Sequence, residues 1–126
     1  MEKSEQFSHF ALVIPVTNLS ASLSYYLEKL GFICDFTWKD PPEYAVLHRG
    51  GVSVHLTAAN PDVRAKMDAP IAYVFVHDVD LVYAQLVSAE ARISEPVADR
   101  DYGMRDFDVV DPDGYCITFG TGLKQD

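Results

Sequence analysis

Cysteine is scarce in this sequence: Cys34 and Cys116 are the only two, and no CxxC pair occurs. Zinc knuckles and disulfide frameworks need more cysteines at closer spacing, so we expect two buried free thiols in a reducing compartment. Long apolar runs are lacking as well. No stretch approaches the ~20 apolar residues of a membrane-spanning helix, and segment 1–6 is charged without an apolar core. The sequence therefore predicts a cytoplasmic protein with no membrane partner.

Positive charge is in short supply, because 10 Lys and Arg stand against 19 Asp and Glu and the formal net charge is −9. This balance repels phosphate backbones and anionic lipids, which makes nucleic acids and membranes poor partners, whereas a cationic ligand would be attracted. Acidity also serves solubility, so the charge alone selects no function. Apolar residues are plentiful, and 126 residues with a 48% hydrophobic share suffice for a single domain, 1–126, with its own core.

The first half of the chain has the pattern of a strand, a helix and three further strands. The expected strands are 10–16, 32–37, 44–48 and 52–57, and the apolar stripe of the helix is Leu19, Leu23, Tyr26, Leu27 and Leu30. Asn18 or Ser20 can cap the helix, and Gly31 ends it because glycine accepts the left-handed conformation. Gly50-Gly51 predicts the turn of a hairpin between the last two strands.

The second half repeats this order. The expected strands are 71–76, 92–94, 105–110 and 115–120, with a polar loop at 95–103, and the helix stripe is Val79, Val82, Tyr83, Leu86 and Val87. Asp78 or Asp80 can cap this second helix. The segment Asp111-Pro112-Asp113-Gly114 predicts a second hairpin turn, because Pro and Asp favour turns and Gly accepts positive φ.

Two separations relate the halves. The helix starts match at 60 residues, with Leu19 on Val79, and the hairpins match at 63, with Tyr44 on Phe107. The resulting repeat comprises residues 9–59 and 71–121, joined by a connector at 60–70. Each unit leaves one sheet face uncovered, so the units are expected to associate. We predict an α+β fold in which two tandem βαβββ units form a concave mixed sheet with a ligand site in its cup.

The motifs in these units resemble the vicinal oxygen chelate superfamily, which includes glyoxalases, extradiol dioxygenases and the fosfomycin and bleomycin resistance proteins. The resemblance is carried by Ile14-Pro15-Val16-Thr17-Asn18-Leu19, by Ser22 through Tyr26 with Leu30-Gly31-Phe32, and by Tyr102-Gly103-Met104-Arg105-Asp106-Phe107 followed by Asp111-Pro112-Asp113-Gly114. It implies a glyoxalase/bleomycin resistance-like fold. It does not decide the chemistry, because members with these motifs catalyse unrelated reactions or none.

Enzymes of this superfamily hold a divalent metal with side chains that point into the cup from the first and last strands of each unit. Motif alignment places these positions at Ala11, His55, Ile71 and Thr118. A catalytic metal generally needs about three protein ligands, and His55 is the one strong ligand in this set. We therefore expect neither a metal nor another cofactor.

A different metal site is conceivable from three histidines. His9 shares a strand face with Ala11, and pairing across the Gly50-Gly51 turn makes His48 and His55 diagonal neighbours. Histidines on strands more often make ordinary hydrogen bonds, so this site is disfavoured.

Aromatic and acidic residues occupy the segments expected to line the cup. The aromatic residues are Phe36, Trp38, Tyr44, Tyr102 and Phe107, and Asp99, Asp101 and Asp106 lie on the adjoining loop. Aromatic faces bind planar or cationic groups, and carboxylates favour cations further. The pattern is similar to the bleomycin resistance branch, whose members lack the metal and sequester a bulky cationic drug in grooves of a dimer. The expected ligand-binding residues are Trp38, Tyr44, His48, His55, Tyr102, Phe107 and Thr118.

Three functions follow as hypotheses. The first is a metal-independent homodimeric binding protein that confers antibiotic resistance by sequestering an aromatic or cationic small molecule. The second is a lyase, isomerase or dioxygenase-type enzyme that uses His55 with His9 or His48. The third is an interaction module whose cup is filled by its own side chains. Nucleophilic catalysis is not expected, because Cys116 lies near acidic residues that oppose a thiolate.

Overall fold

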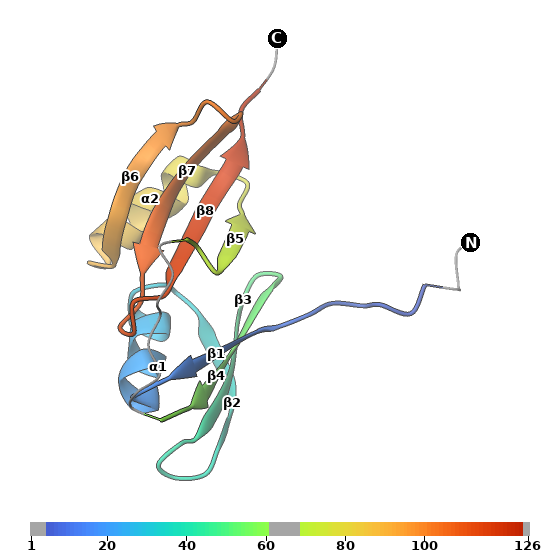
Figure 1. The fold of residues 1–126 in the computed structure, drawn as a ribbon, viewed down its shortest axis with the longest axis vertical. Helices are drawn as coiled ribbons and strands as arrows, with labels where there is room; N and C mark the ends of the chain where they lie inside the picture. Colours follow the sequence, from blue (N-terminus) through green and yellow to red (C-terminus); the bar gives the residue numbers. More distant parts are fainter. Residues whose placement is uncertain (1–4, 61–68, 125–126) are drawn as a thin grey trace.

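The computed structural model describes residues 5–60 and 69–124, which form two units of the same order (Figure 1). The first unit consists of β1 (Leu12–Val16), α1 (Leu19–Glu28), β2 (Ile33–Trp38), β3 (Tyr44–Arg49) and β4 (Val52–Ala58). The second consists of β5 (Ala72–Phe75), α2 (Val79–Ser88), β6 (Arg92–Asp99), β7 (Met104–Val110) and β8 (Cys116–Gly122). Most of the expected connector 60–70 lies outside the described residues. Neither helix is long and apolar enough to cross a membrane within the described ranges.

Each unit forms its own four-stranded mixed sheet. The strand orders are β1-β4-β3-β2 and β5-β8-β7-β6. The first strand of each unit runs parallel to the last, and the other neighbours are antiparallel. This arrangement confirms the predicted α+β fold of tandem βαβββ units. Because β1 and β5 stand at the ends of these orders, each has one edge that pairs with no other described strand.

The helix caps are Asn18 rather than Ser20 and Asp78 rather than Asp80. The Asn18 carboxamide accepts a hydrogen bond from the backbone N–H of Ala21 at 3.1 Å, and the Asp78 carboxylate accepts one from Leu81 at 3.1 Å. Both side chains satisfy an N–H that lacks a partner within the first turn of the helix. The helices therefore begin at equivalent residues, as the separation of 60 predicts.

Strand β6 is longer than the sequence predicts. Its residues 95–99 were expected in a polar loop, but they continue the strand through two register shifts against β7. Pro96 and the charged neighbours are tolerated because β6 is an edge strand, where a missing N–H breaks no ladder. Asp106 also differs from the prediction: it lies within β7 and is buried, not on a loop.

The Asp111-Pro112-Asp113-Gly114 turn joins the two units. The carboxylate of Asp113 accepts hydrogen bonds from the backbone N–H and the hydroxyl of Thr17, at 3.1 and 2.6 Å. Asp111 accepts one from the hydroxyl of Tyr26 at 3.0 Å, and the Tyr25 hydroxyl donates to the carbonyl of Val110 at 2.8 Å. The turn thus receives donors from α1 and from the residue just before its cap.

Alternation along the strands gives each sheet one side that packs under its helix and one open face. Strand register sets the residues of the first open face in rows across the sheet. They are Val13, His55, Val46 and Phe36 in one row, Thr57, Tyr44 and Trp38 in a second, and Ser53 and His48 in a third. The second open face carries Tyr73, Thr118, Asp108 and Glu95 in one row and Gly120 and Asp106 in the next.

Candidate functional site

A tyrosine–histidine pair occupies the centre of the first open face. The Tyr44 hydroxyl and His55 Nδ1 are 2.7 Å apart, and the two rings meet edge to face with centroids 5.5 Å apart. Register explains the contact: His55 pairs with Val46, so Tyr44, two residues before Val46, is its diagonal neighbour. The hydrogen bond fixes the imidazole against β3.

The other two histidines of the alternative metal site have separate partners. His48 Nδ1 lies 2.7 Å from the carboxylate of Asp35 on β2, and His9 Nδ1 lies 2.7 Å from the hydroxyl of Ser8 in the segment before β1. Nowhere in the described parts of the chain do three or more His, Cys, Asp or Glu side chains gather as they would around a metal. The structure does not bring His9, His48 and His55 together within one chain.

The second open face is built on the buried carboxylate of Asp106. It accepts hydrogen bonds from the hydroxyls of Tyr73 and Tyr102, at 2.8 and 2.6 Å, and from Nε of Arg100 at 2.8 Å. Burial disfavours the charged form of Asp106, but these three donors outweigh it and hold its pKa below the ordinary value. The network therefore keeps an anion and a guanidinium at the floor of this face.

Gly120 makes room for the network. A Cβ at this position would overlap the Tyr73 hydroxyl and the Cβ of Asp106. The glycine is therefore required by close approach rather than by backbone conformation.

Beside the network lies a cavity of about 490 Å³. Its lining consists of Pro70, Tyr73, Glu95, Arg100, Tyr102, Asp106, Asp108 and Thr118. The second open face is thus not filled by its own side chains, contrary to the third hypothesis. Within the cavity the Thr118 hydroxyl donates to Asp108 at 2.7 Å. Burial, together with the charge of Asp108, raises the pKa of the Cys116 thiol to about 11, so the thiolate is disfavoured at neutral pH.

The residues at the superfamily's metal positions do not suit a divalent ion. Ala11 and Ile71 offer no lone pair, and the hydroxyl of Thr118 is engaged with Asp108. Ile71 lines a different cavity, between the units. His55 would be left as a single strong ligand, where about three are needed. The residues therefore do not fit the metal of the superfamily's enzymes.

The side chain of Phe107 lies in the core and on neither open face, so its assignment as a ligand-binding residue is wrong. Its ring is fully buried, 5.4 Å from the ring of Phe119 and 5.0 Å from that of Tyr83. The error lies in the alignment of the halves. Thr57 and Gly120 are equivalent at the separation of 63, and they pair with Tyr44 and Asp106, respectively. Tyr44 therefore corresponds to Asp106, at a separation of 62, and not to Phe107. The one-residue slip moves Phe107 to the opposite side of the sheet.

The remaining expected residues divide between the two faces. Trp38 is 51% exposed in the row of Tyr44, with the ammonium group of Lys39 4.5 Å from its ring centre, and Tyr102 is 63% exposed over the second open face. Sequence reasoning missed Tyr73 and Arg100. Tyr73 could have been found, because it lies two residues from Ile71 and so shares its strand face. Arg100 carried no signal, since it lay in the expected loop.

Comparison with known proteins identifies the family of this chain. The profile of the Glyoxalase/Bleomycin resistance protein/Dioxygenase superfamily matches residues 6–119, and the chain belongs to this superfamily. No curated protein sequence matches it.

Solved structures with this fold include TioX from Micromonospora sp. ML1, 24% identical with a TM-score of 0.76 over 93% of this chain and 100% of that one. A glyoxalase/bleomycin resistance protein/dioxygenase from Alicyclobacillus acidocaldarius is 18% identical, with a TM-score of 0.79 over 93% of this chain and 92% of its own. The bleomycin-binding protein of bleomycin-producing Streptomyces verticillus, solved with copper(II)-bleomycin, is 22% identical, with a TM-score of 0.72 over 96% of this chain and 99% of its own. The TM-scores show a common fold.

Proposed function

We propose that this chain is a metal-independent binding protein of the cytoplasm that sequesters an aromatic or cationic small molecule in the grooves of a homodimer. The observation that carries the proposal is the make-up of the two open faces: they present rings and carboxylates, while the superfamily's metal positions hold a single strong ligand. Protection against a toxic compound, as in antibiotic resistance, is the physiological role that such sequestration would serve.

The first open face supplies the aromatic surface. Phe36 and Trp38 are 55% and 51% exposed, and they stand in the same rows as His55 and Tyr44. Large exposed rings are costly to hydrate, and they bind planar groups by stacking and cations by their negative faces. A planar ligand would lie across β2 and β3 against these rings.

The second open face supplies charge. Glu95 and Asp108 flank the cavity whose floor is the Asp106–Arg100 pair. Because Arg100 is already bonded to Asp106, the two flanking carboxylates favour a cationic group or a hydrogen-bond donor on the ligand. The net charge of −9 acts in the same direction at longer range.

A second copy would bring the two faces together. The second-face cavity has no lining residue from the first unit. Within the described residues, strands β1 and β5 each have one edge without a partner strand, and such edges are templates for pairing with another chain. If β1 of one copy pairs with β5 of the other, the first open face of one chain adjoins the second open face of its partner, and each dimer contains two such grooves.

Trp38 is the only tryptophan, so its fluorescence can report binding directly. We expect metal-free bleomycin and copper(II)-bleomycin to quench it saturably at two ligands per dimer, with no effect of chelator on the binding of the metal-free drug. Calorimetry should show Trp38→Ala binding about tenfold or more weakly, because stacking on one aromatic side chain contributes about 1–3 kcal/mol. The control Val87→Ala, at an exposed position on α2, should bind normally. The proposal would be overturned if no saturable binding were found and protein purified without chelator held about one divalent ion tightly per chain.

Acid–base catalysis is a second candidate function, favoured by the Tyr44–His55 hydrogen bond. A histidine oriented by a tyrosine in an open site can exchange protons with a substrate. On any substrate that the protein turns over, His55→Ala should abolish turnover, while His48→Ala, which removes the partner of Asp35, should retain it. Full activity of His55→Ala would exclude this histidine from catalysis.

A further inference from the structure

The two units meet through two equivalent contacts, each between the hairpin turn of one unit and the helix of the other. On one side the β7–β8 turn packs against α1, where the carboxylate of Asp111 accepts from the Tyr26 hydroxyl. On the other side the β3–β4 turn faces α2, where the guanidinium of Arg49 donates to the amide oxygen of Gln85 at 2.7 Å. Arg49 corresponds to Asp111 at the separation of 62, and Gln85 falls one residue before the equivalent of Tyr26. The repeat therefore relates the two contacts.

The first of these contacts is closed, whereas the second is open. Tyr25 and Tyr26 on α1 are only 8% and 0% exposed. Between equivalent paired positions the first hairpin has one residue fewer than the second, and its turn residues Gly50 and Gly51 carry no side chain to fill the space. A cavity of about 440 Å³ remains between this turn and α2, and Leu81 beside it is 54% exposed. We call this space the turn–helix cavity.

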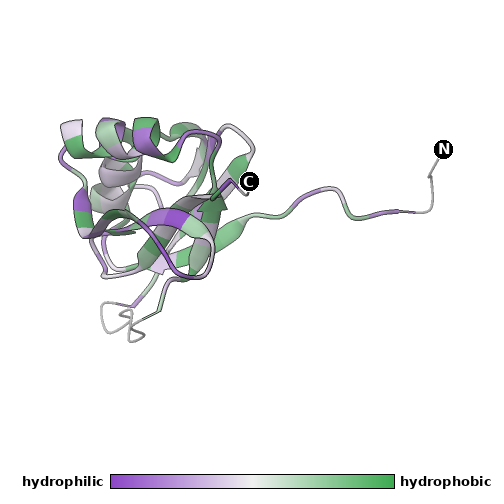
Figure 2. Ribbon diagram, turned by 90° about the horizontal axis from the view of Figure 1, so that it is seen from above, coloured by the Kyte–Doolittle hydropathy of each residue, from purple (hydrophilic) through white to green (hydrophobic). Residues whose placement is uncertain are grey.

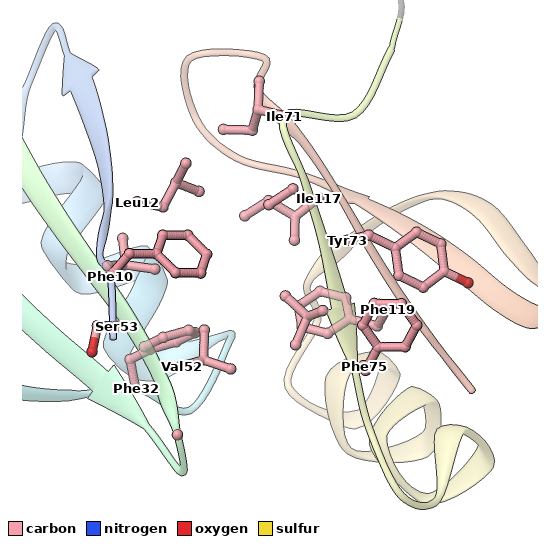
Figure 3. A pocket seen from close by; sticks show the side chains of 14 residues that line it. Phe10, Leu12, Phe32, Val52, Ser53, Ile71, Tyr73, Phe75, Ile117 and Phe119 are labelled. Carbon is pink, nitrogen blue, oxygen red and sulfur yellow. The ribbon is translucent and has the colours of Figure 1, made fainter. Parts of the chain in front are cut away.

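Most of the turn–helix cavity is apolar. Phe32 and Val52 of the first unit line it together with Phe75 and Phe119 of the second, and Phe75 is 74% exposed. The same four residues line the adjoining cavity between the units, which Figure 3 shows. Figure 2 shows the segment before β1 leading away from the packed body, and its described residues, 5–10, do not line the turn–helix cavity. The volume lies in the range of small-molecule pockets, and apolar groups would gain by entering it.

The polar end of the turn–helix cavity holds an arginine whose charge is not balanced. Arg49 donates to the carbonyl of Leu30 at 2.8 Å and to the side chain of Gln85, and both acceptors are neutral. Within the parts of the chain that the structure describes, Arg49 takes part in no ion pair. These two hydrogen bonds fix the guanidinium in place but leave its positive charge to a ligand, and a carboxylate is a strong acceptor for it.

The lining contains one carboxylate, that of Asp78, which is engaged elsewhere. It accepts from the backbone N–H of Leu81 at 3.1 Å and so caps α2, where the positive end of the helix compensates its charge. The net charge of −9 disfavours an anion at long range, but salt screens that effect beyond about 8 Å. Direct contact with Arg49 is screened much less.

We propose that the turn–helix cavity is a second binding site, which takes a small carboxylic acid with an apolar alkyl or aryl body. The body lies among Phe32, Phe75 and Leu81, and the carboxylate bonds to Arg49. The ligand thereby supplies, at the open contact between the units, the carboxylate that Asp111 supplies at the closed one. None of the lining residues belongs to either open face, so this site goes beyond the function proposed above and does not depend on it.

Calorimetric titration of the full chain with decanoate and with 2-naphthoate tests the proposal. We expect each to bind saturably at one molecule per chain, and decan-1-ol, which has the same chain length without the charge, to bind about tenfold or more weakly. Arg49→Met should remove this preference: decanoate should bind about tenfold or more weakly, and decan-1-ol less than twofold differently. Lys29→Met, which removes a cation that does not line the cavity, should bind decanoate as the parent does.

A second pair of variants keeps the arginine and changes the apolar part. Leu81→Asp should weaken decanoate binding about tenfold or more, whereas Val87→Asp, the same kind of change at an exposed position of α2 outside the cavity, should not. Circular dichroism shows whether each variant is folded.

The inference would be overturned if neither carboxylate bound saturably, or if both members of either pair of folded variants bound decanoate alike. Saturating metal-free bleomycin should leave decanoate binding unchanged, and displacement of decanoate by the drug would contradict a separate site. Loss of the Trp38 quenching by bleomycin, with decanoate binding intact, would discredit only the function proposed for the open faces.

Discussion

The hydrogen bond between Tyr26 and Asp111 is the most deeply buried link between the two units, and its removal is a sharp test of the fold. Both residues are almost inaccessible, at 0% and 1% exposure. The Asp111 carboxylate accepts from the Tyr26 hydroxyl at 3.0 Å and from the backbone N–H groups of Asp113 and Tyr115, each at 2.9 Å. Tyr26→Phe removes one of these three donors and changes nothing else in the shape of the core.

The magnitude depends on the charge of Asp111. A hydrogen bond to a charged group contributes about 1.5–3 kcal/mol, against about 0.5–1.5 kcal/mol for a neutral pair. Burial raises the pKa of Asp111 above its ordinary value of 3.8, although its three donors oppose the rise. Because the folded pKa is the higher one, this group's contribution to stability falls as pH rises from below 3.8 through the folded pKa. Tyr26 offsets part of that fall, so its removal should cost about 2 kcal/mol at pH 7.

The assay is urea unfolding followed by circular dichroism between pH 3 and 8. The difference between parent and Tyr26→Phe should be greatest at neutral pH and should shrink to about 1 kcal/mol where the carboxyl is protonated. Tyr115→Phe is the matched control, since that hydroxyl bonds to none of the described residues. A pH-independent difference, or a loss below about 0.5 kcal/mol at pH 7, would refute the idea that the turn joins the units through a charged Asp111.

Three further predictions concern residues of the second unit. Gly120→Ala should lower the free energy of unfolding by about 1–3 kcal/mol, because its Cβ would overlap Tyr73 and Asp106, while Gly122→Ala, which meets nothing within 4 Å, should be neutral in the same urea titration. Asp106→Asn should cost about 1.5–3 kcal/mol at pH 7, because Arg100 keeps its bonds to the carbonyls of Pro96 and of residue 106 but, like the hydroxyls of Tyr73 and Tyr102, loses a charged acceptor. Since the pKa of Asp106 is lowered, the parent should lose this contribution as pH falls through that pKa, and the variant should not. Phe107→Leu should reduce stability yet leave the affinity for a bound drug unchanged in calorimetry, and a selective loss of affinity would contradict its place in the core.

Most of the fold could be predicted because its signals are local. The capping residues Asn18 and Asp78, the stripes of the two helices and the two glycine-containing turns each depend on a few neighbouring residues. The strand β6 could not be predicted in full, since an edge strand accepts Pro96 and charges that would exclude a central strand. Its true length becomes apparent only from its pairing with β7.

The site was predictable only in part, because a ligand face depends on register. His55 and Tyr44 were placed correctly by pairing across a two-residue turn, whose length fixes the register. Between equivalent paired positions the second hairpin has one more residue than the first, and that difference places Phe107 in the core and Asp106 on the open face. Aligning the two halves of the sequence by their glycines does not show this difference in hairpin length.

Neither open face forms a closed ligand site within one chain. Rings such as Trp38 and Phe36 remain half exposed on the first face, and the carboxylates Glu95 and Asp108 surround an open cavity on the second. The first surface is mainly aromatic and the second mainly acidic, and among the described strands β1 and β5 each leave one edge unpaired. Exposed rings and unpaired edges are both unfavourable for an isolated chain, and pairing with a second copy would relieve them together. A monomer that binds ligand as tightly as a dimer would therefore contradict the proposed groove more directly than the loss of any single contact.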